Sequence, residues 1–131
     1  MQTQISYISQ LYKKNKDAMF IGSLGTISKD LTDLGIGIAI RGAMGCVMGI
    51  GLGMALNTKR KVIVLIGEGS FLMHLGSIAT INKYRPNNLK VIILNNNKYA
   101  SCGGQKNNFE NIYTNVCASL NKRAYQFIKV S

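Results

Sequence analysis

Long apolar runs alternate with amphipathic segments along this chain of 131 residues. Residues 61–66 and 89–94 are almost entirely apolar, which is typical of strands covered on both faces of a parallel sheet. The segment between them, residues 71–84, has apolar side chains at helical spacing. This alternation of strand and helix predicts parallel crossovers and an α/β three-layer sandwich with a mainly parallel sheet.

The same pattern predicts five strands and five helices in a single domain that covers residues 1–131. The predicted strands are 18–21, 36–40, 61–66, 89–94 and 125–130. The predicted helices are 4–15, 29–34 with Ser28 as its cap, 42–56 with a small-residue start, 71–84 and 109–121. A polar loop is expected over 95–105.

One alternative is a membrane span over residues 34–56, which have a single charge, Arg41, and are followed by the basic residues 59–61. Length and flanking charge fit such a helix. However, seven glycines make a poor continuous helix, and Arg41 would lie inside the bilayer at high cost. We therefore expect no membrane segment.

Composition narrows the function classes. The net charge is +11, but the lysines and arginines are scattered and Trp is absent, so we do not expect nucleic-acid binding. An anionic ligand or an acidic partner chain fits the charge better. The three cysteines, Cys46, Cys102 and Cys117, lack metal-site spacing, and no secretory leader opens the chain. We therefore expect reduced thiols and a cytoplasmic protein.

Glu68 is the only acidic residue between Asp33 and Glu110, and it follows the apolar run 62–66 between two glycines. Three asparagines, residues 95–97, end the next apolar run. If the two strands are parallel neighbours, the carboxylate and the amides converge where open sheets bind ligands. Such oxygens suit Mg²⁺, which is often shared with a phosphate. Taken alone, residues 67–70 (Gly-Glu-Gly-Ser) fit an ordinary glycine turn equally well.

Three segments, in this order, resemble those of thiamine diphosphate-dependent enzymes. Residues 42–45 (Gly-Ala-Met-Gly) are similar to the segment that grips the cofactor's aminopyrimidine. Residues 67–70, followed by Asn95 and Asn96, resemble the diphosphate-and-magnesium motif. Residues 72–76 and 99–105 look most like the pyrophosphate-binding subunit of sulfopyruvate decarboxylase and the matching half of phosphonopyruvate decarboxylase. The resemblance runs from about residue 24 to residue 106, and it implies the thiamine diphosphate-binding fold of the pyrophosphate module.

The resemblance also implies roles for single residues. Magnesium would be held by the Glu68 carboxylate, the Asn96 side-chain oxygen and the Lys98 backbone carbonyl. The remaining cofactor contacts would come from Gly42, Met44, Gly67, Gly69 and Ser70. No catalytic residue is expected on this chain, because the family activates its cofactor with a glutamate from a pyrimidine-binding domain. We therefore expect a pyrimidine-binding partner subunit, an oligomer, and an anionic 2-oxo acid substrate that loses carbon dioxide.

Two departures keep alternatives open. The family has aspartate where this chain has Glu68, and an extra methylene displaces the carboxylate by about 1 Å, which can cost about 10²-fold in rate. The part after Gln105 is shorter than in related domains, so we expect a domain shortened at its C-terminal end. A non-catalytic relative that acts as a binding or assembly module is one alternative. A subunit of an acetohydroxyacid-synthase-like carboligase is another, which residues 103–105 (Gly-Gly-Gln) fit less well.

Overall fold

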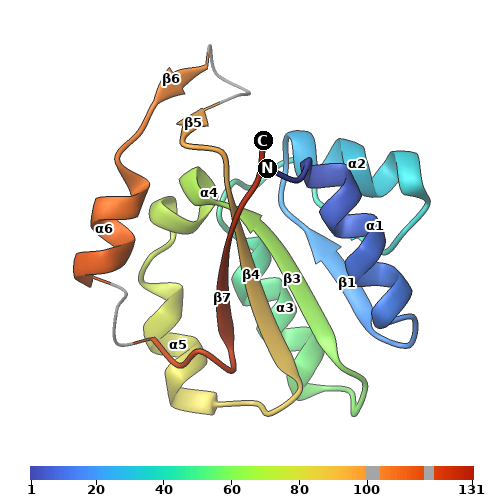
Figure 1. Cartoon of the computed structure of the whole chain (residues 1–131). Coiled ribbons are helices and arrows are strands. Elements are labelled where there is room, and N and C mark those ends of the chain that lie inside the picture. The colour runs from blue at the N-terminus through green and yellow to red at the C-terminus, as the bar shows by residue number, and fades with distance from the viewer. Residues whose placement is uncertain (100–103, 117–119) are drawn as a thin grey trace.

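The computed structural model describes residues 1–99, 104–116 and 120–131 and shows a central sheet with helices on both faces (Figure 1). Five parallel strands form this sheet in the order β2-β1-β3-β4-β7. The strands are β1 (Met19–Gly22), β2 (Ile38–Ala39), β3 (Val62–Gly67), β4 (Leu89–Asn95) and β7 (Tyr125–Lys129). A separate antiparallel pair consists of β5 (Lys98–Tyr99) and β6 (Gln105–Lys106). The expected three-layer α/β architecture is confirmed.

The helices divide into two groups, one on each face of the sheet (Figure 1). One face is covered by α1 (Gln4–Lys14) and α2 (Thr26–Leu34). The other is covered by α3 (Val47–Leu56), α4 (Glu68–Met73), α5 (Ser77–Tyr84) and α6 (Phe109–Val116). Alternate residues of β3 point into the two cores, with Val62, Val64 and Ile66 on one side and Ile63 and Leu65 on the other. This double burial explains why β3 is apolar at every core position.

Two helix starts differ from the expectations, and both differences have a backbone cause. Helix α2 begins at Thr26 after Gly25, whose φ of 90° ends the preceding turn, so Ser28 lies inside the helix and does not cap it. Helix α3 begins only at Val47, because Ala43 and Gly45 have φ values of 53° and 86° that a right-handed helix does not accept.

Two other segments are also more divided than the sequence pattern suggested. The single helix expected over 71–84 is two helices, with a break at residues 74–76, and its first part begins earlier, at Glu68. The polar loop expected over 95–105 includes the short strands β5 and β6 at its described ends. Within the parts of the chain that the structure describes, no helix has the length and hydrophobicity to cross a bilayer. The run 34–56 is divided between the end of α2, strand β2 and α3.

The contact between α3 and the sheet depends on Gly51. A Cβ added there would collide with Cγ2 of Val64, a fully buried residue of β3. We predict that Gly51→Ala lowers the free energy of unfolding by about 1–3 kcal/mol through overpacking. Gly49→Ala and Gly53→Ala, on the open side of the same helix, should raise it by roughly 0.5–1 kcal/mol through helix propensity. Urea denaturation of the three variants measures their free energies of unfolding. Equal changes at positions 49, 51 and 53 would contradict the close approach of Gly51 to Val64.

Asn88 joins the end of α3 to the start of β4. Its Nδ2 group lies 3.0 Å from the carbonyl oxygen of Ala55 and 2.9 Å from those of Thr58 and Arg60. Asn88→Ala removes the donor to these three carbonyls. We therefore predict that it lowers the free energy of unfolding by about 1–3 kcal/mol. The exposed neighbour Asn87, changed to Ala, serves as the control and should stay within about 0.5 kcal/mol of the parent in thermal denaturation.

Candidate functional site

The pairing of β3 with β4 brings the carboxylate and the asparagines to one place. The two strands run parallel with Gly67 opposite Leu94, so Glu68 and Asn95 follow at the same level of the sheet. This is the carboxyl edge, where open α/β sheets bind their ligands. The convergence expected from the sequence is therefore present in the structure.

Glu68 is the first residue of α4, and only 4% of its surface is exposed. Its Oε1 accepts a hydrogen bond from Nδ2 of Asn107 at 3.2 Å. Among the described residues no lysine, arginine or histidine forms an ion pair with it. A buried carboxylate is normally paired with a cation or bound to a metal, because burying an isolated charge is costly. The site thus fits a cation at Glu68.

The three asparagines have different roles. Asn95 is 1% exposed, its Oδ1 accepts from the backbone N–H of Asn97 at 2.9 Å, and its Nδ2 donates to Oδ1 of Asn97 at 2.8 Å. These bonds hold Asn97 in the left-handed region, with φ of 59°, which asparagine tolerates better than most residues. Asn95 and Asn97 therefore shape the turn, and the turn sets the positions of Asn96 and of Lys98 at the start of β5.

Sequence reasoning missed Asn107. It lies 39 residues from Glu68 along the chain and reaches it because its backbone N–H donates to the carbonyl oxygen of Asn97 at 3.0 Å. Its Oδ1 also accepts from the N–H of Phe109 at 3.2 Å and so helps to begin α6. No sequence motif identifies an asparagine that contacts Glu68 from so far along the chain. The position of Asn107 just after the glycine-containing loop was only weak evidence that it belongs to the site.

The segment that contains Gly42 and Met44 reaches the same edge from β2. Gly45 lies so close to His74, after the end of α4, that an added Cβ would collide with the imidazole ring. This contact joins residues 42–45 to α4 and explains why a glycine is needed at position 45. Gly42 is exposed and Met44 is half-buried. The lone histidine therefore packs against the loop at this edge.

Residues 67–70 do not form the ordinary glycine turn that was the alternative interpretation, because Gly67 precedes helix α4 and the next three residues belong to it. Gly67 has an ordinary φ of −75° and open space beyond its Cα, and its N–H donates to Oγ of Ser23 at 3.3 Å. Glycine at position 67 thus leaves room above the sheet edge and is not required by the backbone. Ser70, in the first turn of α4, is 5% exposed. Ser23, at the end of β1, is another contributor that the motif did not reveal.

Conventional metal clusters are missing from the part of the chain that the structure describes. No group of three or more histidine, cysteine, aspartate or glutamate side chains is placed to hold an ion there. Cys46 is a free thiol, whereas Cys102 and Cys117 lie outside the described residues. A cation at Glu68 would therefore need amide and backbone oxygens to complete its coordination, as magnesium accepts.

Comparison with known proteins agrees with this geometry. Residues 18–130 match the family profile of the thiamine pyrophosphate enzyme C-terminal TPP binding domain. The chain is similar to sulfopyruvate decarboxylase subunit beta of Methanocaldococcus jannaschii, with 42% identity over 91 residues, 67% of this chain and 48% of that protein. It is also similar to phosphonopyruvate decarboxylase of Streptomyces viridochromogenes, with 38% identity over 108 residues, 79% of this chain and 27% of that protein. The chain thus spans about half or less of the length of these two relatives. Since the profile match covers most of the chain and every strand of the five-stranded sheet, the chain belongs to the family of C-terminal thiamine pyrophosphate-binding domains of thiamine pyrophosphate enzymes.

Proposed function

We propose that this chain is the pyrophosphate-binding subunit of a thiamine diphosphate- and Mg²⁺-dependent 2-oxo acid decarboxylase of the sulfopyruvate or phosphonopyruvate type. The observation on which this rests is the buried Glu68 carboxylate at the carboxyl edge of the sheet, beside the asparagine turn. The family match and the two relatives support the choice of cofactor and reaction class. We propose further that residues 1–131 form a single domain and that the complex acts in the cytoplasm.

The proposed ligands follow the geometry of the edge. Glu68, the Asn96 side chain and the Lys98 carbonyl would hold Mg²⁺, and Gly67, Gly69 and Ser70 would contact the diphosphate. When bound, the cofactor would supply the electron sink for loss of carbon dioxide from the 2-oxo acid. This chain's own part is to hold the charged end of the cofactor and fix its orientation.

At the other end of the cofactor, the Gly42 carbonyl would accept a hydrogen bond from the aminopyrimidine, and Met44 would pack under the ring system. The contact between Gly45 and His74 supports this assignment, because it holds residues 42–45 against the end of the helix that begins at Glu68. Met44 is half-buried, so part of its side chain remains available to a ligand.

A partner chain is part of the proposal. The sequence has two glutamates, Glu68 and Glu110, and neither belongs to a pyrimidine-binding domain. We propose that the activating glutamate comes from a pyrimidine-binding partner subunit that docks at the carboxyl edge. The relative from Methanocaldococcus jannaschii is itself named a beta subunit, which supports a split enzyme.

A non-catalytic relative is the second candidate, because Glu68 stands where the family's motif has aspartate. Such a chain would keep the fold and act as a binding or assembly module. A carboligase subunit remains a third candidate, which shares the cofactor and differs in the acceptor molecule.

The metal site gives one test. In the complex with its partner subunit, we expect Glu68→Gln to weaken Mg²⁺-dependent binding of thiamine diphosphate by at least about tenfold, because an amide replaces the charged ligand. Glu68→Asp should retain that dependence on Mg²⁺. The control is Asp17→Asn, which also replaces a carboxylate with an amide, at an exposed residue on the opposite edge of the sheet. Titration calorimetry measures the three affinities, and equal binding in the parent and in Glu68→Gln would argue for the non-catalytic candidate.

Assembly gives a second test. Native mass spectrometry of the complex from its source cells, with Mg²⁺ present, should show a second chain together with thiamine diphosphate. That partner's sequence should contain the activating glutamate. The chain alone, or in homo-oligomers without cofactor, would contradict the decarboxylase proposal and favour the binding or assembly module.

A further inference from the structure

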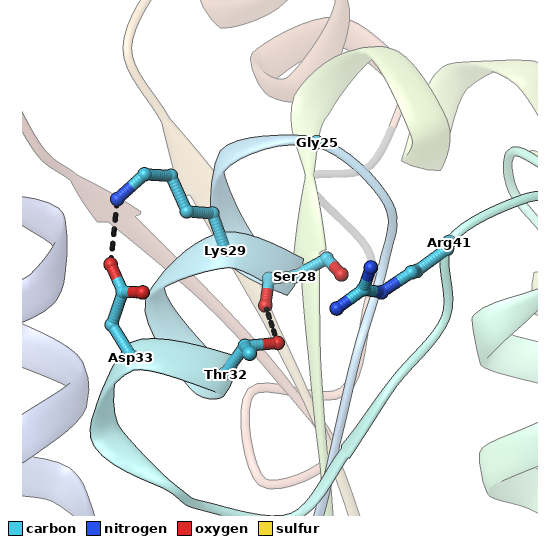
Figure 2. A pocket seen from close by; sticks show the side chains of 6 residues that line it. All are labelled: Gly25, Ser28, Lys29, Thr32, Asp33 and Arg41. Atoms are coloured by element: carbon cyan, nitrogen blue, oxygen red, sulfur yellow. Dashed lines mark hydrogen bonds and ion pairs between the residues drawn. The ribbon is translucent and has the colours of Figure 1, made fainter.

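A cavity of about 320 Å³ opens along α2, from Gly25 to Asp33, next to the segment that follows β2. Figure 2 shows the Arg41 side chain extending from that segment toward Ser28 on the helix. The residues that line the cavity are Gly25, Ser28, Lys29, Thr32, Asp33 and Arg41. Arg41 directly precedes the proposed aminopyrimidine-binding residue Gly42, so the cavity adjoins the carboxyl edge without being part of the metal site.

Ser28 supplies the first sign of a ligand. The residue is only 7% exposed, and its hydroxyl faces the cavity on the side of Arg41 (Figure 2). Thr32 donates its own hydroxyl to the Ser28 backbone carbonyl at 2.8 Å, and the Ser28 hydroxyl takes no part in that bond. Within the described parts of the chain, no hydrogen bond to the Ser28 hydroxyl is formed. Although the residue as a whole is nearly buried, its hydroxyl remains open to the cavity and is therefore available to a ligand bound there.

The charge of the lining supplies the second sign. Lys29 Nζ lies 2.6 Å from Oδ2 of Asp33, and this hydrogen bond is the main reason that the pKa of Lys29 is raised. These two charges cancel within the lining. The nearby Asp30 is not part of the lining; it accepts from Nε2 of Gln4 at 2.8 Å, and this neutral amide does not offset its carboxylate. Arg41 has no acidic partner among the residues that the structure describes. The lining therefore has one uncompensated positive charge.

The start of α2 adds to this positive field. Gly25 is the N-cap residue and offers no side-chain acceptor to the N–H groups of the first turn. Unpaired N–H groups and the helix dipole both favour an anion at such an end. Gly25, Ser28 and Arg41 all line the cavity, so the start of this helix, a hydroxyl and a guanidinium lie around one small space.

We propose that this cavity is a subsite for a tetrahedral oxyanion (a phosphate, phosphonate or sulfonate group) that is bound by the Arg41 guanidinium and the Ser28 hydroxyl. A guanidinium presents two parallel N–H groups that match two oxygens of such a group. The binding step stands independently of the proposed enzyme function. If that function holds, the natural ligand is the distal acidic group of the 2-oxo acid, and Arg41 selects substrates with a second anionic end.

Nuclear magnetic resonance of the full chain tests the site without any need for activity. Inorganic phosphate and methylphosphonate, titrated at constant ionic strength, should shift the Arg41 side-chain N–H and the Ser28 amide in a saturable way. Arg41→Gln should weaken this binding by about tenfold to a hundredfold, as expected for loss of a charge-assisted hydrogen bond. Lys59→Gln also removes one positive charge, at an exposed residue on the opposite edge of the sheet, and should leave phosphate binding unchanged.

Ser28→Ala separates the specific site from general attraction to a basic protein. It removes one hydroxyl and no charge, so it should weaken phosphate binding several-fold while circular dichroism shows a parent-like fold. Absence of saturable binding in the parent, or equal affinity in the parent, Arg41→Gln and Lys59→Gln, would overturn the proposal.

Kinetics of the assembled enzyme distinguish the two sources of the anion, the distal group of the substrate and a free inorganic anion. If the distal group of the substrate occupies the site, Arg41→Gln should raise KM for sulfopyruvate or phosphonopyruvate with little change in kcat, and phosphate should inhibit competitively. If a free inorganic anion occupies it, phosphate binds as before and these kinetic constants stay unchanged. Loss of phosphate binding in Arg41→Gln supports the subsite even when the complex has no decarboxylase activity.

Discussion

The register between β3 and β4 is the constraint on which the rest of the site depends. Each strand is buried on both faces, so a shift of one residue would move every side chain into the opposite core. With the register held in this way, Gly67 lies opposite Leu94, and the first polar residues after both strands emerge at one level. The apolar packing of the two cores therefore determines the position of a carboxylate that takes no part in that packing.

Exposed basic residues lie at both edges of the sheet, and Lys106 and Lys129 are among those of the carboxyl edge. The connections that lead into β1, β3, β4 and β7 contain exposed cations, among them Lys16, Arg60, Arg85 and Arg123. At the opposite edge, Glu68 is buried with one neutral donor, and Arg41 is unpaired within the described structure. A cation bound at Glu68 would lower the cost of bringing a polyanionic cofactor to this edge, so the two ligands should favour each other's binding.

The sequence predicted the strands well and the loops poorly, for physical reasons. Strands β3 and β4 are defined by local apolar runs, and their pairing follows from the strand–helix–strand order. The start of α2 depends on the conformation of Gly25, and the start of α3 depends on Ala43 and Gly45, which no spacing rule reveals. The contact of Asn107 with Glu68 depends on the path of a segment far away along the chain. The convergence of Glu68 with the asparagines was foreseen, whereas the residues that hold this arrangement were not.

The wholly parallel sheet has a consequence for how the chain reaches its structure. Every pairing in the five-stranded sheet joins strands with at least one helix between them in the chain, so none can form as a local hairpin. Loop entropy is lost before such contacts form, and folding is expected to be slow for a chain of this size. During that time, the apolar segments of β3 and β4 are open to other chains. The net charge of +11 opposes such encounters through mutual repulsion, and so protects the chain from aggregation before its sheet is complete.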